Sequence, residues 1–224
     1  MTIFKRKGIV ITSLIVILIG ILGFWKYQSD LANQNLLNRR INAPITRKMP
    51  RATLKKSSIK QFTDDDLLKY RKAAFNMNLD KYPNGYLDIP SIGVYLPIYN
   101  RANNYTLSLG VGKDYFLDSE MGQGNFVLAG HNMERPHVLL SDLYKVKIGQ
   151  KIILHGQDRN YEYSITSKQV VSPYVKFVNG QAAAGSAFYL PKGNETPLVT
   201  VYTCAAGGAT RLVVQGTLNE GGNY

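Results

Sequence analysis

The chain has 224 residues, of which 45% are hydrophobic, and it carries a formal net charge of +12. Residues 1–27 contribute +4, residues 28–62 contribute +7, and residues 63–224 contribute only +1. Because the positive charge precedes the globular part, we expect an anionic surface such as lipid headgroups or wall polymer as its partner, and no nucleic acid. The length allows one large domain or one ordinary domain with appendages, and the single cysteine excludes an intramolecular disulfide.

The N-terminal segment predicts a membrane anchor. Residues 8–24 (GIVITSLIVILIGILGF) carry no charge, and Trp25 and Tyr27 follow where an interfacial aromatic belt would lie. The rival interpretation is a cleavable signal peptide, which would have a shorter apolar core and a small-x-small cleavage site. We therefore expect an uncleaved single-pass anchor within residues 1–27. Basic residues near its two ends balance, and only the cluster at residues 5–7 favours a cytoplasmic tail with an extracellular domain.

A linker and a helix follow the anchor. Residues 28–62 are polar and basic without a sustained period, so they predict a tether, with a helical turn or two around residues 31–37. Residues 63–66 (TDDD) then predict a helix start, because Thr63 can cap it and three carboxylates suit the positive end of the helix dipole. We expect this helix to open a domain that covers residues 63–224.

From residue 85 onward, short apolar runs alternate with turn signals, which is typical of β structure. We predict a mainly β fold of seven or eight strands, a small barrel or sandwich, with short helices near residues 105–109 and 138–144. Residues 179–185 (NGQAAAG) predict a long mobile loop before the last two strands. The expected strands lie in residues 85–99 (a pair joined at 91–93), 125–131, 151–155, 161–171, 198–204 and 211–215.

The last two expected strands carry the first candidate functional residues. Cys204 ends one strand, and Arg211 opens the next after a loop of small residues. A cation near a thiol favours the reactive thiolate, and an arginine can bind the oxyanion that forms when a thiolate attacks an amide. A buried, inert cysteine followed by a solvated arginine explains this stretch equally well.

A histidine is the natural partner of a catalytic thiol, and the chain has three. His131 ends a hydrophobic strand after Gly130, whose missing side chain permits a close backbone approach. It can supply positive charge to the thiol and later protonate a leaving amine. We interpret His155 as structural and His137 as solvent-facing.

Four short motifs, in matching order, resemble those of sortases, the membrane-anchored transpeptidases of Gram-positive bacteria. Residues 200–204 (TVYTC) resemble the family's T-L-x-T-C signature, and residues 129–133 (AGHNM) resemble its histidine motif. Residues 211–216 (RLVVQG) resemble its arginine strand, and residues 89–98 its early strand pair. The matches span residues 86–218. The N-terminal anchor and the short tail after the last strand look most like class A, the housekeeping type.

The resemblance implies a closed eight-stranded β-barrel and a cysteine transpeptidase that cleaves Leu-Pro-x-Thr-Gly sorting signals between Thr and Gly. Cys204 would be the nucleophile, His131 the general acid/base, and Arg211 the oxyanion or substrate-positioning residue. An amine of a cell-wall precursor of the lipid II type would resolve the acyl-enzyme, which attaches surface proteins to peptidoglycan. The residues implied in substrate contacts are Thr203, Ala129, Val201 and Tyr202.

The chain departs from the family pattern at two places. Val201 replaces the usual leucine of the signature, and residues 205–209 lack the acidic residues that many relatives carry, which leaves the loop contacts open. Some members bind calcium near the groove, and Asp114, Asp118 and Glu120 are candidate ligands here. Because a calcium site needs six to eight oxygen ligands, we expect no required metal and no cofactor.

Three alternatives remain open on the sequence. A surface cysteine peptidase would use the same thiol but hydrolyse its thioester. A pilin-polymerising sortase usually adds an occluding N-terminal lid, for which residues 28–84 leave room. A non-catalytic adhesive or receptor domain would simply bury Cys204 as a structural residue.

Overall fold

The computed structural model of the chain describes residues 2–54, 61–173, 177–178, 181–182 and 188–223. Most of the loop predicted at residues 179–185 therefore lies outside the described residues. The chain divides into two compact units, Met1–Arg40 and Ile41–Tyr224.

The first unit is a single long helix, α1 (Thr2–Asn38). It includes the apolar run and continues through the helical turns expected around residues 31–37. Its portion Ser13–Asn38 has a mean hydropathy of 1.4, and it is the one helix in the described part of the chain that is long and apolar enough to cross a membrane.

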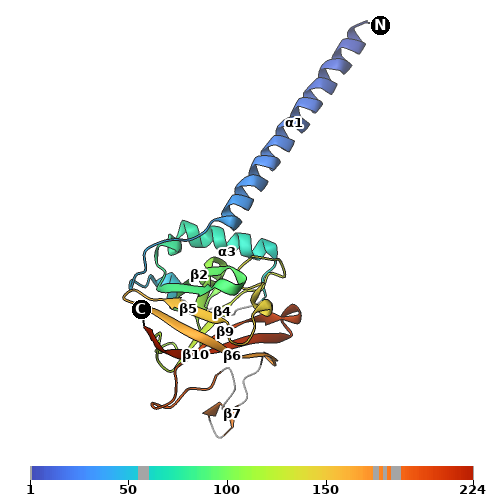
Figure 1. Cartoon of the computed structure of the whole chain (residues 1–224). Coiled ribbons are helices and arrows are strands. Elements are labelled where there is room, and N and C mark those ends of the chain that lie inside the picture. The colour runs from blue at the N-terminus through green and yellow to red at the C-terminus, as the bar shows by residue number, and fades with distance from the viewer. Residues whose placement is uncertain (1, 55–60, 174–176, 179–180, 183–187, 224) are drawn as a thin grey trace. The chain divides into compact units, whose positions relative to one another are not determined.

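The second unit is built on a closed barrel of eight strands, in the order β1-β2-β3-β4-β9-β10-β6-β5. Figure 1 labels β2, β4, β5, β6, β9 and β10 of this barrel. Neighbours pair antiparallel except β2 with β3 and β4 with β9, which are parallel. A separate two-stranded sheet contains β7 (Phe177–Val178) and β8 (Gln181–Ala182). The barrel strands are β1 (Gly85–Ile89), β2 (Val94–Tyr99), β3 (Val111–Lys113), β4 (Asn125–Gly130), β5 (Lys151–His155), β6 (Asn160–Val171), β9 (Leu198–Ala205) and β10 (Thr210–Asn223).

The barrel confirms the predicted fold class, and seven of its strands coincide with predicted ones. The exception is β3, whose three residues are too few to show a period. The expected helix near residues 138–144 is only a 3-10 turn, because His137 and Leu139 adopt left-handed φ angles of 62° and 51° that interrupt a helix. The helices are α2 (Arg51–Leu54), α3 (Asp64–Asn76), α4 (Asn104–Leu109) and the 3-10 turns Leu79–Lys81, Pro90–Ile92, Leu143–Lys145 and Ala206–Gly208.

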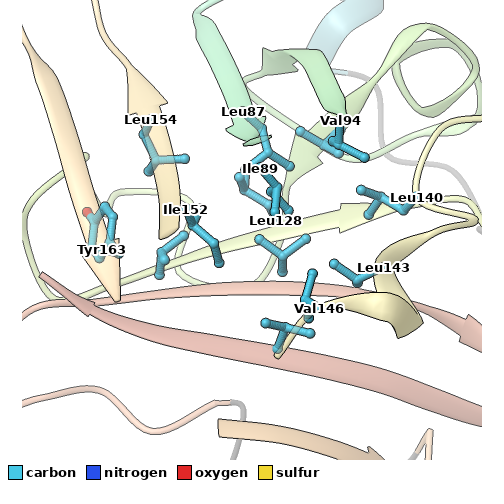
Figure 2. Packing of buried hydrophobic residues seen from close by; sticks show 14 of the residues in the cluster. Leu87, Ile89, Val94, Leu128, Leu140, Leu143, Val146, Ile152, Leu154 and Tyr163 are labelled. Carbon is cyan, nitrogen blue, oxygen red and sulfur yellow. The ribbon is translucent and has the colours of Figure 1, made fainter. Parts of the chain in front are cut away.

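The alternate residues of the strands fill the barrel with apolar side chains (Figure 2). In β5, for example, Ile152 and Leu154 are fully buried while Lys151 is exposed, as the alternating sequence predicts. Each fully buried aliphatic side chain contributes about 1.5–3 kcal/mol to folding. Tyr163 is also fully buried, and its hydroxyl accepts a hydrogen bond from the Gly122 N–H at 2.9 Å. This core holds the strand ends that carry the candidate site in fixed positions.

The chain before the barrel is attached to it. The Tyr86 hydroxyl donates to the Ala43 carbonyl at 2.6 Å, and the Asn103 side-chain amide donates to the Thr53 carbonyl at 3.3 Å. Residues 41–54, predicted as part of a tether, thus belong to the folded unit. Helix α3 begins as predicted, with a capping box between Thr63 and Asp66.

Candidate active site

The hairpin between β9 and β10 sets Cys204 directly opposite Arg211. Its turn needs small residues, because Ala206, Gly207 and Gly208 adopt left-handed φ angles of 48°, 62° and 91°. Arg211 Nη1 donates to the Gly208 carbonyl at 2.8 Å and to the Thr210 carbonyl at 3.0 Å. The turn therefore fixes the guanidinium beside the thiol.

Strand β4 brings His131 to the same end of the barrel. It runs parallel to β9, and the last pair of their register is Gly130 with Thr203, so His131 follows where Cys204 follows on the neighbouring strand. A Cβ atom on Gly130 would lie 2.5 Å from Leu140 Cδ1. The close approach expected at this glycine is therefore confirmed.

The three predicted catalytic residues meet at one cavity of about 160 Å³. Two of the four residues implied in substrate contacts, Ala129 and Tyr202, also line it. Its further apolar lining residues are Leu107, Tyr115, Val171, Pro173, Phe188 and Val213.

Val201 and Thr203 do not line this cavity among the described residues. Successive side chains of a strand point to opposite faces, so these two lie on the other face of β9 from Tyr202 and Cys204. Val201 belongs to the barrel core, and Thr203 is 1% exposed. Neither side chain is therefore placed to contact a substrate in this cavity.

The ring of Phe62 covers His131. The two ring centroids are 3.8 Å apart with an interplanar angle of 29°, and Phe62 also stacks on Tyr70 at 5.2 Å. His131 is only 2% exposed, and its Nε2 atom has no hydrogen-bond partner among the described residues. Because burial disfavours the charged form, it lowers the pKa of His131 to about 4, against a smaller opposing effect of Asp66. Burial thus favours the neutral imidazole at pH 7, and the ring of Phe62 stacks on it.

The thiol is neutral as well. Burial raises the pKa of Cys204, and the positive charge of Arg211 lowers it by a smaller amount. The sequence led us to expect the positive charge near the thiol to come from His131. In this structure that charge comes from Arg211, because burial favours the neutral form of His131.

Three aromatic residues line the cavity, and two of them were not among the residues predicted from the sequence. Tyr115 and Phe188 pack with ring centroids 3.9 Å apart, and both rings also lie near Tyr202. The Tyr202 hydroxyl donates to the Asp114 carboxylate, which ties β9 to the segment after β3. Asp114, a candidate calcium ligand, is therefore engaged by Tyr202. The described residues contain no group of three His, Cys, Asp or Glu side chains placed to hold a metal ion.

The other two histidines are held by polar contacts outside this cavity. His155 Nδ1 lies 2.9 Å from Asn160 Oδ1, and its Nε2 lies 3.4 Å from Asp88 Oδ2. His137 is 82% exposed and lies 3.0 Å from the Asp142 carboxylate. Their expected structural and solvent-facing roles agree with these positions.

We expect Phe62→Ala to raise the pKa of His131 from about 4 towards its ordinary value near 6.5, because water would reach the ring. In the parent protein, an unfolded histidine binds protons below about pH 6.5 while the folded one does not, so the free energy of unfolding falls as the pH drops towards 4. This fall should shrink in the variant. NMR titration of the histidine Cε1 protons and unfolding at several pH values would measure both effects.

Phe75→Ala is the matched control, because Phe75 lies in helix α3, which begins just after Phe62, and packs in a different cluster. It should lose stability without changing the His131 titration. Equal titration curves for His131 in the parent and in Phe62→Ala would contradict the covering role of Phe62.

Comparisons with known proteins identify the family to which the barrel is similar. Residues 87–219 match the family model described as a Sortase domain. Sortase A of Bacillus anthracis is 38% identical over 99 residues, which cover 44% of this chain and 47% of that protein. Sortase A of Listeria monocytogenes is 34% identical over 100 residues, covering 45% of this chain and 44% of that protein. The chain thus spans about half the length of these curated relatives. A solved structure of the Listeria monocytogenes sortase A aligns with a TM-score of 0.52 and 27% identity, covering 62% of this chain and 88% of that one.

Proposed function

This chain belongs to the sortase family of cysteine transpeptidases, and we propose that it is a class A member that anchors surface proteins to peptidoglycan. Its substrate would be a Leu-Pro-x-Thr-Gly sorting signal, cleaved between Thr and Gly. Its second substrate would be the amine of a cell-wall precursor of the lipid II type. The observation that carries this proposal is the meeting of Cys204, His131 and Arg211 at one cavity. The identity to the Sortase A proteins favours class A.

The proposed reaction begins from a neutral thiol and a neutral imidazole. When the sorting signal enters and Phe62 moves aside, His131 accepts the proton of the Cys204 thiol. The sulfur then forms a bond with the carbonyl carbon of the signal's Thr, and the carbonyl oxygen becomes an oxyanion. Arg211, fixed by its turn beside the thiol, would stabilise that charge.

The tetrahedral intermediate then collapses to a thioester. The bond between the Thr carbonyl carbon and the Gly nitrogen breaks, and the imidazolium of His131 donates its proton to the leaving amine. The acceptor amine next attacks the thioester and gives a proton to His131, and Cys204 leaves as a thiolate that is reprotonated. The apolar lining at Leu107, Ala129 and Phe188 suits the Leu-Pro part of the signal.

In the proposed setting, α1 anchors the chain in the membrane with the barrel on the outer face. The apolar portion Ser13–Asn38 supports the anchor by its length and hydropathy. The clustered basic residues 5–7 support a cytoplasmic N-terminus.

Product analysis tests the proposed function. Full-length protein in detergent is incubated with a Leu-Pro-x-Thr-Gly peptide, with and without triglycine, and the products are identified by mass spectrometry. We expect a new amide that joins the signal's Thr to triglycine, because the amine resolves the thioester faster than water does.

The remaining outcomes separate the alternatives. Hydrolysis without an amine adduct would identify a cysteine peptidase, and preference for the side-chain amine of a lysine peptide over triglycine would identify a pilin-polymerising enzyme. If no peptide is cleaved, whichever residue occupies the x position of the signal, the result would favour a non-catalytic surface domain.

A further inference from the structure

We propose that Asn132 is a positioning residue, which sets the separation of the His131 imidazole and the Cys204 thiol. This inference rests on the proposed function. Asn132 does not contact the imidazole or the thiol. It belongs to the segment that carries His131, and its side chain contacts the backbone of the strand that carries Cys204.

The register of the barrel explains the place of Asn132. The parallel pairing of β4 with β9 ends at Gly130 and Thr203, one residue before each catalytic side chain. Beyond that pair the backbone ladder no longer joins the two strands. At this point the side-chain amide of Asn132 donates from Nδ2 to the Cys204 carbonyl at 3.2 Å. The Asn132 side chain therefore links the two chain segments just beyond the last backbone pair of β4 and β9.

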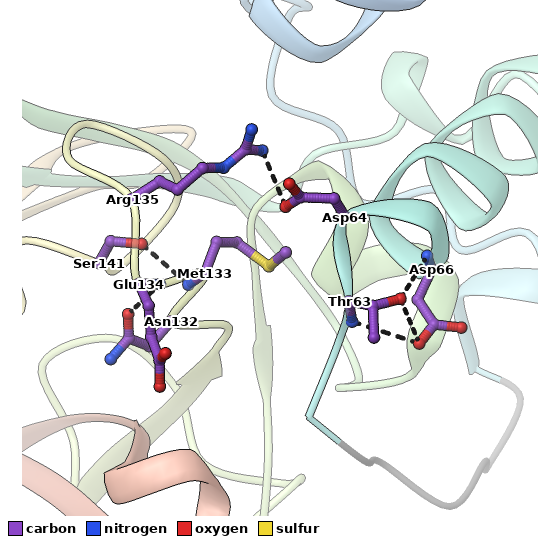
Figure 3. Close-up of polar contacts among 8 residues, drawn as sticks. All are labelled: Thr63, Asp64, Asp66, Asn132, Met133, Glu134, Arg135 and Ser141. Carbon is purple, nitrogen blue, oxygen red and sulfur yellow. Dashed lines mark hydrogen bonds and ion pairs between the residues drawn. The ribbon is translucent and has the colours of Figure 1, made fainter.

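A second hydrogen bond fixes the orientation of that amide. Asn132 Oδ1 accepts from the Glu134 N–H at 2.8 Å (Figure 3). With the oxygen engaged in this way, the amide nitrogen is the atom that is directed at the Cys204 carbonyl. An aspartate at this position could keep the contact with Glu134, but it would present an oxygen to the Cys204 carbonyl. Only the amide satisfies both partners.

The backbone around Asn132 is held on its other side. The Met133 N–H donates to Ser141 Oγ at 2.9 Å, and the Leu140 N–H donates to the His131 carbonyl at 3.0 Å. Arg135 also pairs with Asp64 at 3.1 Å, which ties the same loop to the start of α3 (Figure 3). Because these contacts hold the loop, the hydrogen bond of Asn132 also restricts the position of His131, its neighbour in the chain.

The distance between a thiol and its base governs the rate of proton transfer. A displacement of about 1 Å in an active site can cost roughly 100-fold in rate. Loss of the Asn132 contact releases the histidine loop from the cysteine strand but leaves the burial of the thiol and its neighbour Arg211 in place. Catalysis should therefore suffer while the intrinsic reactivity of Cys204 does not.

The experiment compares Asn132→Ala and Asn132→Asp with the parent protein, full-length in detergent. Asn160→Ala is the matched control, because Asn160 makes a similar side-chain contact with His155 at a different part of the barrel. The measurements are kcat and KM for the triglycine reaction, the rate of Cys204 alkylation by iodoacetamide against pH, and the thermal midpoint.

We expect kcat of Asn132→Ala to fall about 10- to 100-fold with KM changed less than about threefold. The pH midpoint of Cys204 alkylation should equal that of the parent protein. The thermal midpoint should match that of Asn160→Ala. Asn132→Asp should not recover kcat, because it keeps the Glu134 contact and loses the donor.

Two results would overturn the positioning role. One is a kcat in either Asn132 variant that equals the kcat of the parent protein. The other is a loss of kcat matched by an equal loss of thermal stability or of alkylation rate, which would mean general disruption. A parent protein without any peptide cleavage would overturn the proposed function together with this role, whereas an active parent with unaffected variants would overturn this role alone.

Discussion

Cys204→Ala is expected to abolish both peptide cleavage and amine transfer, with a fall in kcat of at least about 10⁴-fold. The reason is that no other residue of this chain carries a thiol, so the acyl-enzyme cannot form. The fold should persist, because Cys204 is only half-buried at a strand end and its removal leaves little void. The triglycine assay and a thermal unfolding curve measure the two properties side by side.

Cys204→Ser is the companion variant, since it keeps the size of the side chain and replaces the sulfur nucleophile by a much weaker hydroxyl. Iodoacetamide should add one group to the parent protein and none to either variant, as judged by intact mass. Retention of cleavage in Cys204→Ala would refute the nucleophile assignment. Resistance of the native thiol to every alkylating reagent would instead support a purely structural cysteine.

Arg211→Ala is expected to lower kcat about 10²- to 10³-fold, the usual cost of removing one oxyanion donor. It should also raise the pKa of Cys204 further, because the positive charge of Arg211 opposes the effect of burial on that thiol. Since alkylation requires the thiolate, the midpoint of the alkylation profile should move to higher pH. Both effects are read from steady-state rates and iodoacetamide kinetics.

Arg211→Lys separates charge from geometry. A lysine keeps the positive charge, so the alkylation midpoint should stay near that of the parent, but it lacks the planar fork that holds the turn carbonyls, so kcat should remain low. Arg159→Ala, which removes an arginine that contacts Tyr161 on another strand pair, should change neither. If the pH midpoint of Cys204 alkylation in Arg211→Ala equals that of the parent protein, the electrostatic role of Arg211 is contradicted.

Local sequence signals predicted much of the fold. The Thr63 cap, the alternation of β5 and the small-residue turn after Cys204 each follow from interactions within a few residues. The three catalytic candidates followed from the resemblance of their motifs, and the register between the strands then explains why they meet.

Long-range contacts were beyond the sequence. Nothing near Phe62 indicates that its ring lies on His131, because 69 positions separate them and only the tertiary fold joins them. The attachment of residues 41–54 to the barrel has the same origin. The placement of Val201 and Thr203, by contrast, was available from strand alternation alone: if Cys204 faces a cavity, Tyr202 shares its face and those two do not.

The raised pKa of Cys204 affects the resistance of the protein to oxidation. Oxidants attack thiolates far faster than thiols, and this thiol is half-buried and protonated at pH 7. With no second cysteine in the chain to form a protective disulfide, over-oxidation to sulfinic acid would be permanent. Burial therefore keeps the only thiol of the chain mainly in the form that peroxide attacks slowly, and oxidation should be faster during turnover, when the thiolate is formed.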